Sequence, residues 1–489
     1  MKKTSNIFVF LILLLALLFT SNSAFAIKEW TIMSYLDADN DLEEYLLADF
    51  VEMGAVGSTD QVNIVAQVDR VSGYTTAYGN WTNTRRFYIK KGDTPSSTPL
   101  EQLGELNMGD KNTLRDFIIW AVTNYPAKKY MLILSNHGGG WRKRNMQGKV
   151  TKAICWDETN NDDCLYMKDV QIAMKDAENA TGKKITVIGF DACLMAMIEV
   201  ATDMKDCADV MIASEEVEPG NGWPYTPVLT KLTTTPTMTG GQLASIIVDE
   251  YALSYKGIDS TITLSAVDLT KISALNTSIK TFVDNANQWT KIKDARLATR
   301  TYSEADGYPH ADLGHFMSLL SSKGVTDPAV LSAAAAVRNN LTAAVFANKY
   351  GSSRTNSNGL AIFFPKTTTA YTNAQGSAYP TKDFNLATGW DSFLKKYFNP
   401  PADKPISDLS GAAAVDGSGV ATLSRTTPVP VNTSLSSVTL TFTAQEDLSG
   451  GQVRITIPST WTAPALSGAG TIALTKGTGV SATFTISGY

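Results

Sequence analysis

The chain has 489 residues, of which 44% are hydrophobic, so we expect a globular protein with more than one hydrophobic core. Its formal net charge of -5 argues against nucleic-acid binding and against general attraction to membranes. Four cysteines in so long a chain exclude a disulfide-based scaffold.

The first 26 residues have the pattern of an export signal. Lys2 and Lys3 precede an unbroken apolar stretch, residues 7–19, and Ala26 ends a site typical of signal peptidase. The apolar stretch is shorter than the roughly 20 residues that a membrane-spanning helix needs. We therefore predict a signal peptide over residues 1–26 and a mature chain that is secreted, extracellular or periplasmic, without stable membrane insertion.

Apolar strand-like runs alternate with helical patterns over residues 27–400. We expect strands near residues 30–36, 62–68, 85–89, 130–136, 185–190, 209–214, 261–267 and 359–364. We expect helices after the acidic residues 37–41, which would cap the first one, after Asp110, over 167–180 and from Leu194 to Asp206. The alternation predicts an α/β domain with a mainly parallel sheet covered by helices on both faces.

Composition changes near residue 400. Residues 401–489 contain few charges, are rich in Thr, Ser, Gly and Val, and include alternating runs at 437–442 and 452–457. Such short alternating runs are typical of an all-β module, so we predict a separate β-sandwich-like domain.

His137 and Cys193 stand out because each follows an apolar run directly. Functional sites in parallel sheets gather at the carboxyl ends of the strands. If the two runs are neighbouring strands, an imidazole and a thiol emerge together, which is how a cysteine nucleophile is built. Three glycines follow His137, and their amides can stabilise an oxyanion, with Gly138 and Cys193 as the candidate donors. The alternatives are a structural histidine and a buried, inert cysteine.

Asp191 lies two residues before Cys193 and therefore on the same side of an extended segment. A carboxylate there would select a basic substrate side chain, with Arg favoured by bidentate pairing. The alternative is a helix-capping aspartate. The loop that follows the next strand contains Glu215 and Trp223, which we expect to line the substrate pocket, although an ordinary acidic surface loop has the same composition. We also expect the thiol to lie at a helix N-terminus, which favours thiolate.

Five basic residues lie between the two strands: Arg142, Lys143, Arg144, Lys149 and Lys152. They form either a solvated loop or, in an enzyme that cuts after basic residues, a self-cleavage site. In the same region Cys155 and Cys164 are either a small disulfide loop or unpaired thiols. We expect Cys207 to be structural.

Four stretches resemble the clostripain family of cysteine peptidases: residues 30–43, 136–141, 190–196, and 213–216 with 222–225. The resemblance implies a caspase-like fold, shared with gingipains and legumains, and a dyad of His137 and Cys193. Their separation of 56 residues is similar to that in caspases. The resemblance also implies cleavage after Arg or Lys with Asp191 as the specificity residue, and synthesis as a zymogen that is cut between His and Cys.

We therefore predict a secreted endopeptidase that acts on protein or peptide substrates with Arg or Lys at the P1 position, by way of an acyl-enzyme. The mechanism requires no cofactor. Some family members use calcium. The acidic residues Asp157, Glu158, Asp162 and Asp163 make no complete ligand pattern, so the sequence does not decide whether this chain binds calcium. Two alternatives are an amidase or transpeptidase on the same fold and a surface-binding protein, in which the β module attaches to a surface or polymer.

Overall fold

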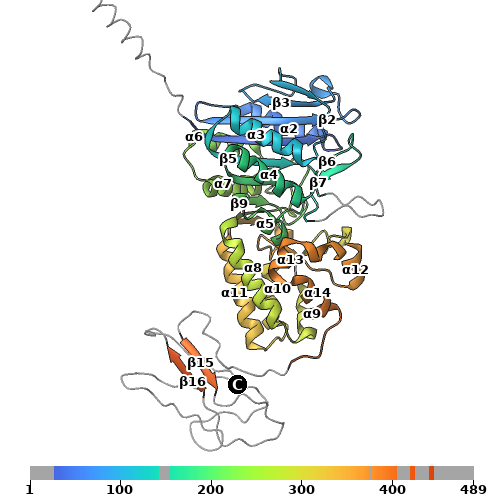
Figure 1. Ribbon diagram of the computed structural model, residues 1–489, viewed down its shortest axis with the longest axis vertical. Helices are drawn as coiled ribbons and strands as arrows, with labels where there is room; N and C mark the ends of the chain where they lie inside the picture. The colour runs from blue at the N-terminus through green and yellow to red at the C-terminus, as the bar shows by residue number, and fades with distance from the viewer. Residues whose placement is uncertain (1–26, 142–152, 375, 405–418, 424–439, 445–489) are drawn as a thin grey trace, which may run out of the picture. The chain divides into compact units, whose positions relative to one another are not determined.

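The computed structural model describes residues 27–141, 153–374, 376–404, 419–423 and 440–444 (Figure 1). The chain divides into two compact units, residues 1–406 and 407–489. The expected signal peptide and the five basic residues of the 142–152 loop lie outside the described residues. Within the described ranges, no helix combines the length and apolarity needed to cross a membrane.

A nine-stranded sheet organises the first unit, in the order β13-β10-β9-β8-β5-β1-β2-β3-β4. The five central strands, β9, β8, β5, β1 and β2, are parallel, and the pairs at both edges are antiparallel. The expected mainly parallel sheet is therefore confirmed at its centre. The strands are β1 (Lys28–Ala38), β2 (Val62–Arg70), β3 (Thr84–Tyr88), β4 (Glu101–Gly104), β5 (Ala127–Ser135), β8 (Ile185–Asp191), β9 (Ala208–Ala213), β10 (Thr263–Asp268) and β13 (Val345–Tyr350).

Helices cover both faces of this sheet, which explains why its central strands are nearly continuous apolar runs. Along β1, Met33 and Tyr35 pack on one face, whereas Ile32 and Leu36 pack on the other. The first face is covered by α3 (Lys111–Asn124), α4 (Met167–Thr181) and α5 (Ile198–Met204), and the second by α2 (Glu43–Val56), α6 (Tyr225–Thr234) and α7 (Gly240–Ser254).

Two helix starts test the capping predictions. Asp110 caps α3 as expected, because its carboxylate accepts a hydrogen bond from the amide of Asn112. The prediction that the acidic residues 37–41 cap the first helix is wrong. Helix α2 begins at Glu43 without a side-chain cap, and Asn40 instead accepts a hydrogen bond from the amide of Leu42. Of the acids before it, Asp41 contacts His137, as described below.

A mainly helical part begins in the chain after β10, is interrupted by β13, and is coloured yellow-green to orange in Figure 1. The expected strand near 359–364 forms here as β14, which joins β12 in a separate three-stranded sheet and not the main one. The elements of the helical part are α8 (Ile272–Asn285), α9 (Trp289–Ala298), β11 (Thr301–Tyr302), β12 (His310–Asp312), α10 (Leu313–Ser322), α11 (Pro328–Ala344), β14 (Ala361–Phe363), α12 (Thr368–Asn373), α13 (Asp383–Thr388) and α14 (Trp390–Phe398).

Of the second unit, the structure describes one antiparallel pair, β15 (Gly419–Leu423) with β16 (Leu440–Ala444). Strand β16 overlaps the run expected at 437–442, whereas the run at 452–457 lies outside the described residues. The β-sandwich and the domain boundary near residue 400 stay predictions.

Candidate active site

The strands that precede His137 and Cys193 are adjacent and parallel. Ser135, the last residue of β5, lies opposite Asp191, the last residue of β8. One residue further along, the amide of Asn136 donates to the carbonyl oxygen of Asp191 at 3.4 Å. His137 and Cys193 therefore follow the carboxyl ends of two neighbouring strands, on the same side of the sheet's strand ends. This is the arrangement that the sequence predicts.

Gly138 lets the two loops approach closely. A Cβ atom at this position would lie 2.2 Å from the carbonyl oxygen of Cys193 and 3.0 Å from its amide nitrogen. Any other residue would have to push the backbone of Cys193 away. The next amide, that of Gly139, donates to the carbonyl oxygen of Ala153 at 2.9 Å and ties the loop to the start of β6 (Ile154–Asp157). The first glycine after His137 thus brings the backbone of the candidate nucleophile into contact with the His137 loop.

Asp41 contacts the imidazole of His137. The distance from its Oδ1 to Nε2 of His137 is 2.5 Å. Asp41 follows the carboxyl end of β1, the neighbour of β5 in the sheet. Because a carboxylate only accepts hydrogen bonds, Nε2 is the protonated nitrogen in this contact. Sequence reasoning missed this residue, and only the adjacency of β1 and β5 could have identified it.

Cys193 does not lie at a helix N-terminus, so that prediction is wrong. Leu194 has φ of 64° and α5 begins only at Ile198. The intervening backbone bonds to the segment that follows β9, where the amide of Ala196 donates to the carbonyl oxygen of Ser214 at 2.7 Å. Burial raises the pKa of the Cys193 thiol, partly offset by the amide of Glu218, which donates to Sγ at 3.3 Å. The resting side chain is therefore a thiol.

The carboxylate of Asp191 is buried beside Cys193, with 7% of the residue exposed. Its Oδ2 accepts hydrogen bonds from the hydroxyl of Tyr225 at 2.7 Å and from the amide of Trp223 at 3.3 Å. It caps no helix, because the segment that follows β8 is a turn. Burial raises the pKa of Asp191 to about 6, against the lowering effect of these donors. The acid is thus positioned by its neighbours without a basic partner among them.

Glu218 is a second acid at this position that sequence reasoning missed. The indole Nε1–H of Trp223 donates to its Oε2 at 3.2 Å. Burial, followed by the charges of Asp191 and Cys193, raises the pKa of Glu218 well above its usual range. Asp49 of α2 is also buried nearby, and the charge of Asp191 contributes to raising its pKa. The carboxyl groups of Asp49, Asp191 and Glu218 therefore lie close together, and none of the three forms an ion pair with Lys or Arg among the described residues.

The loop after β9 is not the acidic surface loop that its composition allows. Trp223 is buried, with its amide donating to Asp191 and its indole to Glu218, and its predicted contact with substrate stays a prediction. Glu215 does not lie in the Asp191 pocket, because its carboxylate accepts a hydrogen bond from the amide of Gly359 and lies against Asp312. Glu216 is buried and forms an ion pair with Arg354 at 2.7 Å. Glu215 and Glu216 thus attach the loop to the helical part, and the predicted substrate contact of Glu215 is not supported.

The remaining three cysteines are buried. No disulfide joins Cys155 and Cys164, although they lie on the paired strands β6 and β7 (Asp163–Leu165). Cys207 is buried just past α5, and burial raises its pKa to about 11, as expected of a structural thiol.

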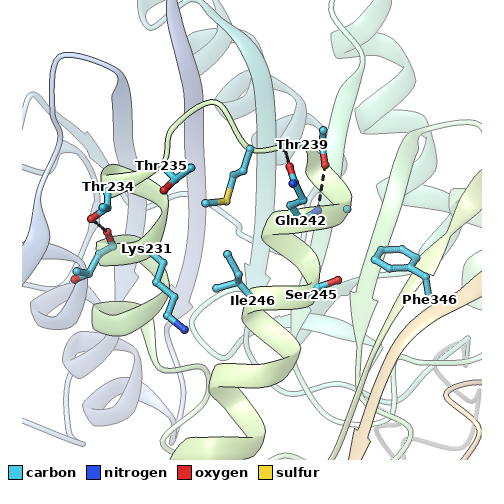
Figure 2. A pocket seen from close by; sticks show the side chains of 11 residues that line it. Lys231, Thr234, Thr235, Thr239, Gln242, Ser245, Ile246 and Phe346 are labelled. Atoms are coloured by element: carbon cyan, nitrogen blue, oxygen red, sulfur yellow. Dashed lines mark hydrogen bonds between the residues drawn. The ribbon is translucent and has the colours of Figure 1, made fainter.

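A groove lies at the opposite end of the sheet, between α6 and α7. Its wall includes Lys231 and Thr234 of α6, Gln242 and Ile246 of α7, and Phe346 of β13 (Figure 2). The loop between these helices is fixed to the amino ends of β1 and β5, because the carbonyl oxygen of Met238 accepts hydrogen bonds from Trp30 and Lys129. No residue of this groove belongs to the His137 and Cys193 site.

The sequence profile of the clostripain family matches residues 34–397. Clostripain from Hathewaya histolytica is 35% identical over 227 residues, which make up 41% of this chain and 42% of that protein. The match thus spans less than half the length of this curated relative.

Two solved structures have a similar fold. One is a secreted C11 cysteine protease from Bacteroides thetaiotaomicron in complex with an irreversible peptide inhibitor, with a TM-score of 0.58 and 20% identity. The other is an inactive zymogen C11 protease from Parabacteroides distasonis, with a TM-score of 0.58 and 18% identity. Each alignment covers 74% of this chain and 99% of the other. At these identities the likeness concerns the fold alone.

Proposed function

The chain belongs to the clostripain family, and from this premise we propose that it is a secreted cysteine endopeptidase that cleaves peptide bonds after Arg or Lys. The observation that carries the proposal is the pairing of β5 with β8, which brings His137 and Cys193 to one sheet edge with Asp191 beside the thiol. The curated relative and the C11 protease structures support the class of enzyme.

In the proposed mechanism, His137 and Cys193 act as a dyad. Because burial favours the thiol, the proton leaves Sγ for the imidazole when the substrate binds, and the sulfur attacks the scissile carbonyl. Asp41 holds Nε2–H, so Nδ1 is the nitrogen that exchanges this proton. His137 then protonates the leaving amine, and later activates the water that hydrolyses the acyl-enzyme.

The oxyanion would be stabilised by the backbone amides of Gly138 and Cys193. The close contact between these residues supports this assignment, because it holds the two loops together beside the sulfur. Fixed amides of this kind stabilise the developing charge without reorganisation during the reaction.

The P1 side chain would bind to Asp191, with Glu218 as a second acid and Trp223 as part of the pocket wall. A guanidinium or ammonium group supplies the counter-charge that the buried carboxyl groups lack. A planar guanidinium can also pair with a carboxylate through two hydrogen bonds.

We further propose that residues 1–26 are a signal peptide, that residues 27–400 form the peptidase domain, and that residues 401–489 form a β module that binds a surface or polymer. Self-cleavage would occur at one of Arg142, Lys143, Arg144, Lys149 and Lys152. The zymogen state named for the Parabacteroides distasonis relative supports an inactive precursor.

The proposal is tested with fluorogenic peptide amides that end in Arg, Lys or Asp, assayed with the wild-type chain and with Cys193→Ala. We expect cleavage of the basic substrates by the wild type alone. An added amine nucleophile distinguishes hydrolysis from transpeptidation, because an acyl-enzyme that prefers amines gives a coupled product. If no basic substrate is cleaved even after proteolytic activation, the proposed function is wrong.

A further inference from the structure

Two buried carboxyl groups meet where the loop after β9 contacts the helical part. Glu215 belongs to that loop, and Asp312 is the last residue of β12 and caps α10. Both residues are almost fully buried, and their side chains lie within hydrogen-bonding distance of each other. Two carboxylates cannot form a hydrogen bond, because neither has a proton to donate. One of the two groups is therefore protonated in this contact.

Asp312 has the hydrogen-bond donors that an ionised carboxylate needs. Its Oδ1 accepts from the amide of His315 at 2.6 Å and from the side-chain amide of Asn358 at 2.8 Å. Its Oδ2 accepts from the amide of Asn358 at 2.5 Å and from the hydroxyl of Tyr302 at 3.0 Å. Donors of this number favour the charged form of Asp312, even though the group is buried.

Glu215 has fewer donors. Its Oε2 accepts a hydrogen bond from the amide of Gly359 at 3.1 Å, whereas its Oε1 has no donor within the described part of the chain. The hydroxyl of Tyr302 contacts both acids, but it has one proton to donate. Burial, followed by the charge of Asp312, raises the pKa of Glu215 well above its usual range. The proton of the pair therefore belongs to Glu215.

Among the described residues, no Lys or Arg forms an ion pair with either acid. Arg354 is paired with Glu216 at 2.7 Å, and Nε of Arg300 donates to the carbonyl oxygen of Thr355 at 3.0 Å. His315 accepts a hydrogen bond at Nδ1 from the amide of Arg300, and burial lowers its pKa, so its ring is neutral. A shared proton thus takes the place of a counter-charge.

The loop that carries Glu215 also contacts the candidate nucleophile, at two points. The amide of Glu218 donates to Sγ of Cys193 at 3.3 Å. The carbonyl oxygen of Glu216 accepts a hydrogen bond from the amide of Leu194 at 3.0 Å. Loss of the shared proton would leave two buried negative charges in contact, and their repulsion would weaken the attachment of this loop to the helical part.

We propose that Glu215 stays protonated at neutral pH and donates a hydrogen bond to the ionised Asp312, and that this acid pair positions the loop beside Cys193. The positioning role rests on the proposed function of Cys193 as the nucleophile. The proton itself is tested without any peptidase activity. Glu215 is thus a positioning residue that acts through the loop and not through contact with substrate.

Infrared difference spectroscopy at neutral pH tests the proton directly. The full-length chain with Cys193→Ala, which cannot cleave itself by way of this thiol, is compared with the same chain carrying Glu215→Gln. We expect the second chain to lack one C=O band of a protonated carboxyl group. Glu216→Gln is the matched control, because its carboxylate is ionised in the pair with Arg354, and it should keep the band. A protonated-carboxyl signal that is the same in Glu215→Gln and its parent overturns the proposal.

The pH dependence of stability gives a second test on the same two chains. In the unfolded chain Glu215 ionises near its ordinary pKa of 4.5, whereas the native chain keeps the proton to higher pH. The native state then binds more protons than the unfolded state, so the stability contributed by Glu215 decreases as pH rises above that value. Glu215→Gln is free of this loss, and its amide can donate to Asp312. The Tm difference in its favour should therefore grow from about pH 5 to about pH 8, and a constant difference overturns the proposal.

The positioning role is measured on the active enzyme with an Arg peptide amide. Glu215→Ala should lower kcat about tenfold with little change in KM, and Glu215→Gln should restore most of the rate. The wild type should lose kcat reversibly at alkaline pH, where Glu215 ionises, and Glu215→Gln should not. Equal kcat in Glu215→Ala and the wild type contradicts the positioning role. If the wild type cleaves no basic substrate, the proposed function and the positioning role are both wrong, while the infrared and Tm results still decide whether the acids share a proton.

Discussion

Asp41 Oδ1 lies 2.5 Å from Nε2 of His137, which gives the imidazole a carboxylate partner from the neighbouring strand end. The contact selects the protonated nitrogen and orients the ring, while the side chain of Asp41 stays exposed at the surface.

We expect Asp41→Asn to lower kcat about tenfold or more, with little change in KM, because the residue positions His137 and does not touch substrate. Steady-state kinetics on an Arg peptide amide measure this effect. Asp41→Glu should restore part of the rate, and Glu44→Gln, an exposed acid one turn away, should behave like the wild type. A loss confined to KM would contradict the positioning role.

Asp191→Asn is expected to lower kcat/KM for Arg and Lys substrates by about 100-fold, because a buried charge partner is lost. The amide can keep the hydrogen bond from Tyr225, so the fold should persist. Asp209→Asn, a surface acid paired with Lys184, is the matched control. If Asp191→Asn cleaves basic substrates at the wild-type rate, Asp191 has no role in specificity.

The raised pKa of Asp191, about 6, predicts two pH effects. Binding of basic substrates should weaken as pH falls through about 6, because the carboxylate becomes protonated; KM for an Arg substrate between pH 5 and 8 measures this. In the unfolded chain the group ionises near its ordinary pKa of 3.8. Between these values the native state holds the extra proton, so the contribution of Asp191 to stability decreases as pH rises from about 4 to about 6.

The Tm of Asp191→Asn relative to the wild type measures this second effect. The difference should shift in favour of the variant as pH rises through that window. A difference that does not change with pH would mean that Asp191 has an ordinary pKa.

Gly138→Ala should abolish most activity, by about 100-fold or more, because the new Cβ would overlap the carbonyl oxygen of Cys193 and displace the nucleophile. Activity and Tm are measured together. Gly241→Ala is the control, since a Cβ there meets only Phe346 at 3.8 Å. Full activity in Gly138→Ala would show that the close approach is not needed for catalysis.

The strand-end pair was predictable because the apolar runs before His137 and Cys193 have the character of central parallel strands. The position of Asp191 beside Cys193 was predictable from the spacing of two residues along an extended segment. The turn after Cys193 was not predictable, because the apolar residues 194–197 favour a helix but bond instead to the segment that follows β9. Tertiary hydrogen bonds override local propensity there.

Contacts between distant segments could not be predicted from the sequence either. The contacts of Asp41 and Glu218 depend on which strands are neighbours, and the acidic run at 37–41 looks locally like a helix cap. Glu215 has the same composition and loop position as a pocket residue, yet it turns toward Asp312.

The most direct test of the central claim is covalent labelling by an irreversible peptide inhibitor with Lys or Arg at P1, followed by peptide mass spectrometry. We predict a single adduct on Cys193, lost in Cys193→Ala and strongly slowed in His137→Ala. An adduct on Cys155, Cys164 or Cys207 in place of Cys193, or no adduct on the proteolytically activated enzyme, would contradict the account.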